Sequence, residues 1–121
     1  MEVLLQTKVT KIGDLVADFL REKTLIIFND DVPDELHDMA VLHTKSPTTK
    51  EVSAGDYLIV EGDSYRVTSV GEKANETLIS IGHCTIKFDG ATTPDLPGTL
   101  HVEEKEIPPL AIDTELAFVR K

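Results

Sequence analysis

The sequence has little of what a secreted, nucleic-acid-binding or membrane-spanning protein needs. Its 121 residues contain one cysteine, Cys84, so no internal disulfide can form, which fits a reducing compartment. Lysine and arginine number 12 against 22 acidic residues, and the net charge of -10 opposes binding to nucleic acid. No apolar run approaches the roughly 20 residues that span a bilayer, and the N-terminus lacks the pattern of a signal peptide. We therefore expect a cytoplasmic protein without a nucleic-acid partner or direct membrane insertion.

Short alternating and β-branched runs make up most of the pattern that is present. With 40% hydrophobic residues, the chain can bury the core of one domain, which we place at residues 1–121. Punctuation by glycine, proline and aspartate separates the runs and predicts about six or seven strands. The clearest runs cover residues 2–12, 24–28, 57–61, 65–70, 83–88, 99–102 and 115–119. The predicted fold is mainly β, a small closed or nearly closed β-barrel.

Helical signals are few. An amphipathic pattern begins at Gly13-Asp14 and ends near Lys23, and Pro33 with its following acids is typical of a short helical turn. Residues 75–81 fit a short helix closed by Gly82 in the left-handed conformation, although their alternation also suits a strand. We expect one amphipathic helix and one or two short helical turns.

No phosphate-binding loop, zinc-ligand pair or nucleophile elbow is present, so the histidines are the main candidates for chemistry. His43 ends the apolar run 39–43, which predicts a buried strand that delivers the imidazole to the rim of the fold, open to solvent. His83 and His101 lie on predicted strands, on faces directed away from the core. His37 reads as a surface histidine in an acidic turn, and Cys84 as a buried structural cysteine.

Two kinds of site remain open from the residues alone. Three strand histidines could converge on zinc, which would suit a non-enzymatic β-barrel binding or adaptor module. Alternatively, one histidine is a nucleophile and another orients it or stabilises the group that it receives. A neutral imidazole carries an unshared electron pair at neutral pH and can accept a phosphoryl group directly.

Several motifs together resemble a known family. They are Gln6-Thr7, Thr10-x-Ile12-Gly13, the apolar run that ends at His43, Val70-Gly71, Gly82-His83-x-Thr85-Ile86-Lys87-Phe88-Asp89-Gly90 and Pro97-Gly98-Thr99-x-His101-Val102. The chain resembles, nearly end to end, the glucitol/sorbitol-specific IIA component of the bacterial sugar phosphotransferase system.

This resemblance implies a closed β-barrel that works as a phosphotransferase component through a phosphohistidine. Its partners would be the phosphorylated histidine-containing phosphocarrier protein, which donates the phosphoryl group, and the sugar-specific IIB/IIC membrane components. His43 matches the family's phosphoryl acceptor, and His83 and His101 match positions that could stabilise the phosphate or orient the ring. Thr44 and Lys45 are candidate phosphate-binding residues. No metal and no cofactor are implied, because the bond energy arrives with the phosphoryl group.

Overall fold

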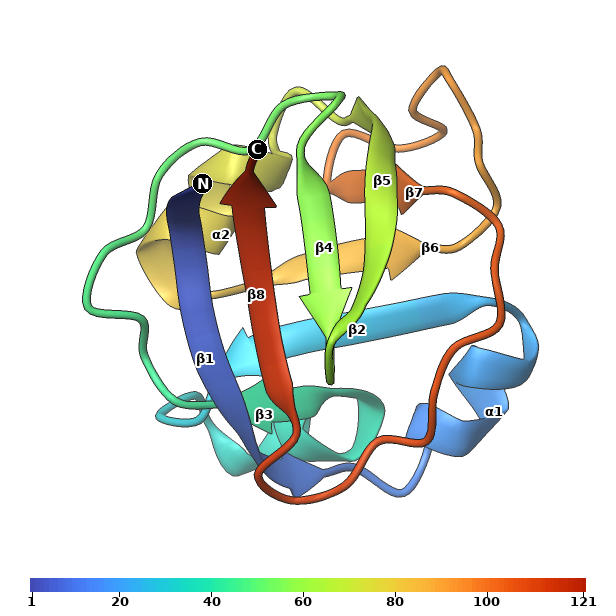
Figure 1. Cartoon of the computed structure of the whole chain (residues 1–121). Coiled ribbons are helices and arrows are strands. Elements are labelled where there is room, and N and C mark those ends of the chain that lie inside the picture. The colour runs from blue at the N-terminus through green and yellow to red at the C-terminus, as the bar shows by residue number, and fades with distance from the viewer.

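Eight strands close into a barrel with two α-helices and one 3₁₀ helix at its ends (Figure 1). The computed structural model describes residues 1–121. The strands are β1 (Glu2–Ile12), β2 (Thr24–Asn29), β3 (Val41–His43), β4 (Tyr57–Val60), β5 (Asp63–Val70), β6 (Cys84–Lys87), β7 (Thr99–Val102) and β8 (Glu115–Arg120). The helices are α1 (Val16–Arg21), the 3₁₀ helix η1 (Asp34–Met39) and α2 (Ala74–Ile81).

The prediction of a mainly β closed barrel is confirmed, but the expected count of about six or seven strands is wrong. The eight strands are the seven runs given above and β3, the apolar run ending at His43 that itself predicts a buried strand, so only the count is one short. β3 is only three residues long, yet it pairs with β1 on one side and β2 on the other. A run this short carries no alternation to count, so its place in the sheet is decided by its neighbours.

The order of strands around the barrel is β1-β3-β2-β6-β7-β5-β4-β8, and β8 returns to β1. Two neighbouring pairs, β2 with β3 and β6 with β7, are parallel, and the other pairs are antiparallel. A parallel pair needs a crossover connection. η1 lies in the crossover between β2 and β3, and the loop at residues 88–98 is the crossover between β6 and β7.

The barrel interior is filled by the inward side chains of every strand. In β1, Leu5, Thr7 and Val9 are buried, whereas Gln6 and Lys8 are exposed, as alternation requires. Val3 breaks the expected pattern because the register shifts between Val3 and Leu5, which turns Val3 outward and buries its neighbour Leu4. A bulge of this kind leaves no sequence signal.

The hairpin turn after β4 and the end of α2 both form where the sequence places a glycine. Between β4 and β5, Glu61 and Gly62 both have positive φ, the geometry of a tight hairpin turn, one residue earlier than the predicted Gly62–Ser64 turn. α2 is a helix that ends at Gly82 with φ of 65°, so the helical reading of residues 75–81 is confirmed and the strand reading is wrong. None of the helices has both the length and the apolar character needed to cross a bilayer.

A second, smaller apolar cluster lies on the outer side of β2 and β3. Phe28, Ala40 and Leu42 are buried there beneath the side chains of the segment that carries η1. This cover explains why β3 is buried along its whole length. It also fixes Phe28 beside the segment that follows α2.

Removing the side chain of Phe118 tests how much the packed interior of the barrel contributes to stability. This side chain is fully buried in β8, the strand between β1 and β4. We expect Phe118→Ala to lower the free energy of unfolding by about 3–5 kcal/mol, because it removes an aromatic ring and leaves a cavity. Urea unfolding measures this change. The control Ile112→Ala, at an exposed position, should change it by no more than about 0.5 kcal/mol; equal losses in the two variants would contradict the placement of Phe118.

Candidate functional site

His43 occupies the last position of β3, opposite Val9 of β1 and Asn29 of β2. The alternation of β3 places Val41 in the main core and Leu42 in the outer cluster. The His43 side chain is 0% exposed, so the expectation that it is open to solvent is wrong. The chain between α2 and β6, at Gly82, lies against it.

Both ring nitrogens of His43 face backbone carbonyl oxygens. Nδ1 lies 2.8 Å from the oxygen of Thr44, and Nε2 lies 2.9 Å from the oxygen of Gly82. A neutral imidazole has one N–H, so it can donate to only one of these carbonyls at a time. The other contact then places a lone pair against an oxygen. The site therefore holds the ring tightly but satisfies the neutral ring only in part.

Gly82 belongs to this site because its backbone approaches both His43 and Asn29 closely. A Cβ added to Gly82 would lie 2.1 Å from Oδ1 of Asn29 and 2.8 Å from Cε1 of His43. With its positive φ, the position excludes other residues both by conformation and by space. The sequence marks Asn29 only as the end of a strand and Gly82 only as a helix cap, so neither was identified as a site residue.

His83 follows directly and lies on the outer side of the strand end. Its ring stacks on Phe28 with a centroid distance of 3.9 Å, and its Nδ1 donates to the carbonyl of Ile27 at 3.0 Å. Burial lowers the pKa of His83, and the hydrogen bond to Ile27 opposes that effect only in part. A neutral ring with its proton on Nδ1 presents a lone pair at Nε2. His83 is thus near His43 through Gly82, and at neutral pH it is not a hydrogen-bond donor at Nε2.

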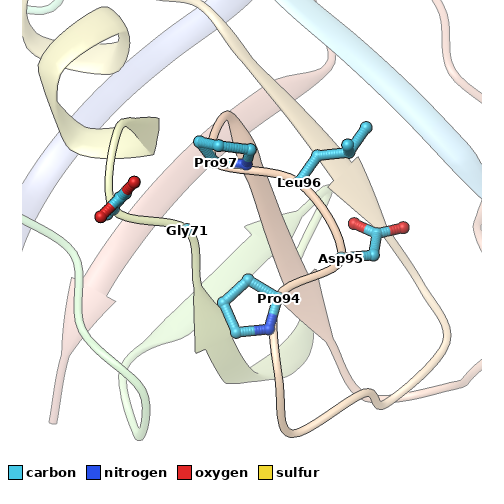
Figure 2. A pocket seen from close by; sticks show the side chains of 6 residues that line it. Gly71, Pro94, Asp95, Leu96 and Pro97 are labelled. Carbon is cyan, nitrogen blue, oxygen red and sulfur yellow. The ribbon is translucent and has the colours of Figure 1, made fainter.

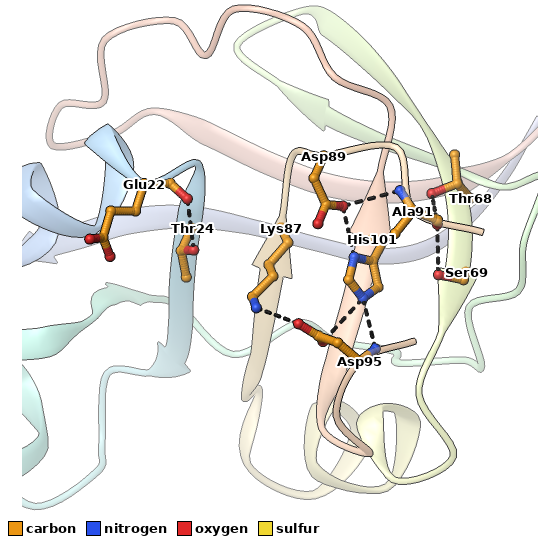
Figure 3. A network of polar contacts seen from close by, with 9 residues as sticks. All are labelled: Glu22, Thr24, Thr68, Ser69, Lys87, Asp89, Ala91, Asp95 and His101. Atoms are coloured by element: carbon orange, nitrogen blue, oxygen red, sulfur yellow. Dashed lines mark hydrogen bonds and ion pairs between the residues drawn. The ribbon is translucent and has the colours of Figure 1, made fainter. Parts of the chain in front are cut away.

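His101 is in a different environment (Figure 3). Its ring is 0% exposed, although its strand face was predicted to point to solvent. Nδ1 donates to Asp89 at 2.8 Å, and Nε2 lies 3.3 Å from a carboxylate oxygen of Asp95, which also pairs with Lys87. The loop that carries the two carboxylates covers the outer face of β7, which explains the burial. The sequence indicates only turn residues at these positions.

The register of the strands separates His101 from His43. Asn29 pairs with His43, whereas Thr24, at the other end of β2, pairs with Lys87, which in turn pairs with His101. From Thr24 to Asn29 is about 16 Å along the strand, and β2 and β6 both lie between β3 and β7. The structure therefore brings His83 but not His101 to His43.

Thr44 and Lys45 lie beside His43 on the outer side of β1. Thr44 extends the pairing of β3, with its N–H donating to the carbonyl of Lys8 and its Oγ1 accepting from the N–H of Lys8. The ammonium group of Lys45 pairs with Asp31 at 2.6 Å and is mostly exposed. A polar cleft of about 350 Å³ opens here, lined by Gln6, Thr7, Lys8, Thr44, Lys45, Pro47 and Glu115. Its lining carries two lysines and one carboxylate, and Asp31 pairs with one of the lysines, so the cleft is close to neutral on an acidic protein.

The arrangement gives no support to a zinc site. No group of three His, Cys, Asp or Glu side chains lies close enough together to hold a metal ion. Cys84 is fully buried, as predicted, and burial raises the pKa of its thiol to about 12, so it is not a reactive thiolate at neutral pH.

Another cleft lies on the His101 side of the barrel, away from His43. Figure 2 shows Gly71 beside the loop Pro94–Pro97. The cleft that these residues help to line has a volume of about 270 Å³. A Cβ on Gly71 would lie 2.2 Å from the carbonyl oxygen of Pro97, so the two backbones are in direct contact. Its lining carries two carboxylates, Glu72 and Asp95, and no cation.

Comparison with known proteins shows which fold and family the chain shares. The crystal structure of a PTS system IIA component from Enterococcus faecalis V583 superposes with a TM-score of 0.85 at 30% identity, covering 95% of this chain and 99% of that one. The fold thus has the architecture of a phosphotransferase-system IIA component.

The sequence comparisons define the family more narrowly. The model of the "PTS system glucitol/sorbitol-specific IIA component" family matches residues 4–117. The glucitol/sorbitol-specific EIIA components of Shigella flexneri and of Escherichia coli K12 are each 33% identical over 102 residues, which is 84% of this chain and 83% of theirs. The chain belongs to the glucitol/sorbitol-specific IIA family of the phosphotransferase system.

The His101 network predicts a particular dependence of stability on pH. Burial would raise the pKa of Asp89, but the hydrogen bond from His101, with help from the Ala91 N–H and the charge of the ring, holds it below its usual value. Chiefly through the hydrogen bond from Lys87, the pKa of Asp95 is lowered too. A carboxyl group whose pKa is lowered in the folded state stabilises the fold at pH values above its unfolded-state pKa of about 3.9. This stabilisation is lost as the pH falls through the folded-state pKa.

We expect His101→Gln to lower the free energy of unfolding at pH 7 by on the order of 1 kcal/mol, through the loss of a charge-assisted hydrogen bond. Urea unfolding at pH 7, 5, 4 and 3 should show a smaller loss of stability on acidification in the variant than in the native protein. Parallel pH curves for the two proteins would show that Asp89 does not depend on His101.

Proposed function

We propose that this protein is a cytoplasmic phosphoryl carrier that accepts a phosphoryl group on His43 from the phosphorylated histidine-containing phosphocarrier protein. It passes the group to the IIB component, which works with the IIC membrane component in the uptake and phosphorylation of glucitol (sorbitol). Membership of the family supports the role. The observation that carries the choice of His43 is its ring, fixed at a strand end with Nδ1 against the carbonyl of Thr44.

The fixed ring suggests which atom reacts. When Nδ1–H donates to Thr44, the lone pair is on Nε2, the nitrogen farther from the backbone. In the proposed step this lone pair attacks the donor's phosphorus, an N–P bond forms, and the donor's N–P bond breaks with its electron pair returning to the donor imidazole. The Nδ1 proton stays on His43. Phosphoryl transfer of this kind depends mainly on positioning and on electrostatic stabilisation, and it needs no metal from this chain.

The surroundings of His43 supply part of that stabilisation. Lys8 and Lys45 line the neighbouring cleft, and we propose that Thr44 and Lys45 offset the charge of the incoming phosphate there. His83 has a different role from a phosphate donor, because at neutral pH its Nε2 presents a lone pair. We assign it the orienting role, since its stacked ring holds the backbone that contacts His43. His101 lies too far from His43 to take part.

A labelling experiment tests the choice of acceptor. Incubation with the ³²P-labelled phosphocarrier protein should give an acid-labile, base-stable label on the native protein and none on His43→Gln. The matched control is His37→Gln, which also removes a ring with both nitrogens engaged, to Lys11 and Val32, and should be labelled normally. Retention of the label in His43→Gln, or its appearance on Cys84, would overturn the assignment.

Lys45 tests the electrostatic part of the proposal. Because its ammonium group is exposed and paired with Asp31, we expect Lys45→Gln to slow phosphoryl transfer by less than about tenfold, with the difference shrinking at high salt. Transfer rates at 50 and 500 mM NaCl measure this effect. Lys73→Gln removes an exposed, paired lysine on another face and should have no effect. A loss as large as that of His43→Gln would mean that Lys45 contacts the reacting group.

A further inference from the structure

We propose that the corner formed by Gly82 and His83 gates His43, with Gly82 as the positioning residue, and that the corner moves away each time a phosphoryl group reaches or leaves Nε2. This inference rests on the proposed function of His43. It adds a conformational step that neither the family match nor the resemblance of the fold contains.

A phosphoryl group on Nε2 of His43 needs space that the closed corner does not leave. The carbonyl oxygen of Gly82 lies 2.9 Å from Nε2, which is hydrogen-bonding distance, and the ring has no exposed surface. A phosphorus atom bonded to Nε2, with its three oxygens, cannot fit between these two atoms. A phosphorylated His43 and a closed corner therefore exclude each other.

The protonation state of His43 also determines how well the ring holds the corner. The doubly protonated ring donates to both Thr44 and Gly82, but it has no lone pair and cannot attack phosphorus. The neutral ring that can attack keeps its proton toward Thr44 and turns its lone pair toward the oxygen of Gly82, where two acceptors repel each other. The protonation state that makes His43 nucleophilic thus also weakens the contact that closes the corner.

The corner can move without opening the barrel. It is held by two backbone hydrogen bonds at the end of α2, from the N–H of Gly82 to Leu78 and from the N–H of His83 to Thr77, each 3.1 Å long. Thr77 Oγ1 also donates to the carbonyl of His83. The pairing of β6 with β2 begins at Cys84, one residue further on. Breaking the cap leaves every strand pair intact.

Outside, the His83 ring sets how firmly the corner is held. Its stack on Phe28 and its hydrogen bond to Ile27 connect the corner to β2, the strand that also carries Asn29. The end of α2 beside it exposes Ile79 and Ile81, at 46% and 41%. Opening the corner therefore changes an apolar part of the surface next to Gly82, so the phosphorylated and unphosphorylated proteins differ there.

Amide hydrogen exchange compares the two states directly. In the native protein phosphorylated by the phosphocarrier protein, the amides of Gly82 and His83 should exchange at least about tenfold faster than in the unphosphorylated protein. The amide of Gly71, bonded to Thr99 at the other end of α2, is the internal control and should not change. If mass spectrometry finds the label on His43 and the corner amides are unchanged, the gate is overturned and the proposed function stands. A label elsewhere overturns both.

The variant Gly82→Ala tests whether a corner that cannot close leaves His43 accessible. A Cβ would collide with Asn29 and His43, so the corner could not close, and the reaction of His43 with diethyl pyrocarbonate should accelerate at least about tenfold over the buried native ring. Gly62→Ala is the matched control: its φ is also positive, 89°, but no atom lies within 4 Å of the added Cβ, and it should leave the reaction unchanged. Equal His43 reactivity in the native protein and in folded Gly82→Ala would overturn the gate; if Gly82→Ala does not fold, the exchange experiment decides.

Discussion

The closure of the barrel by β1 is the constraint on which the rest of the structure depends. β1 lies between β3 on one side and β8 on the other, so the first strand of the chain joins both ends of the sheet. Its register shifts twice, near each end, and the second shift lies between Val9 and Lys11. Val9 is the residue paired with His43. Because a bulge bends a strand and increases its twist, this irregularity is where the wall turns around the candidate site.

Two buried histidines in one barrel show how the partner atoms decide what an imidazole can do. The ring of His101 donates from Nδ1 to Asp89, and its Nε2 lies beside the N–H and the carboxylate of Asp95, which makes the ring part of a stabilising network. His43 faces two uncharged carbonyl oxygens, which cannot both be satisfied by a neutral ring. Both ring nitrogens of His101 can be satisfied at the same time. The environment of His43 contains a built-in conflict, which suits a residue that has to react.

Much of the fold follows from local patterns in the sequence. The long strand β1, the turn at Gly62 and the cap at Gly82 each depend on alternation or on glycine geometry, which neighbours in the chain determine. The apolar run 39–43 predicts that β3 is a strand, but its partners and the bulge beside Val3 depend on pairing with other segments of the chain, which no local pattern predicts.

The site divides in the same way. His43 could be chosen because it ends an apolar run and matches a family motif, and the resemblance suggested that His83, His101 or both lie near it. Its burial could not be predicted, because the cover comes from Gly82, which is 39 residues away in the chain. The distance between His43 and His101 is a consequence of the strand order, and Asn29 became visible only through the contact with Gly82. Residue types predict chemistry, but contacts across the barrel predict access.

The pairing of β1 with β8 also bears on how the protein is made. Glu2 pairs with Arg120, so the barrel cannot close until almost the whole chain has been synthesised. Contacts this distant in sequence are slow to form, and the edges of β1 and β4 that pair with β8 stay open until that strand has been synthesised. The closeness of the two ends has another consequence. A short linker between them would give a circular chain that can be opened at a hairpin turn, and folding would then no longer depend on the last strand to be synthesised.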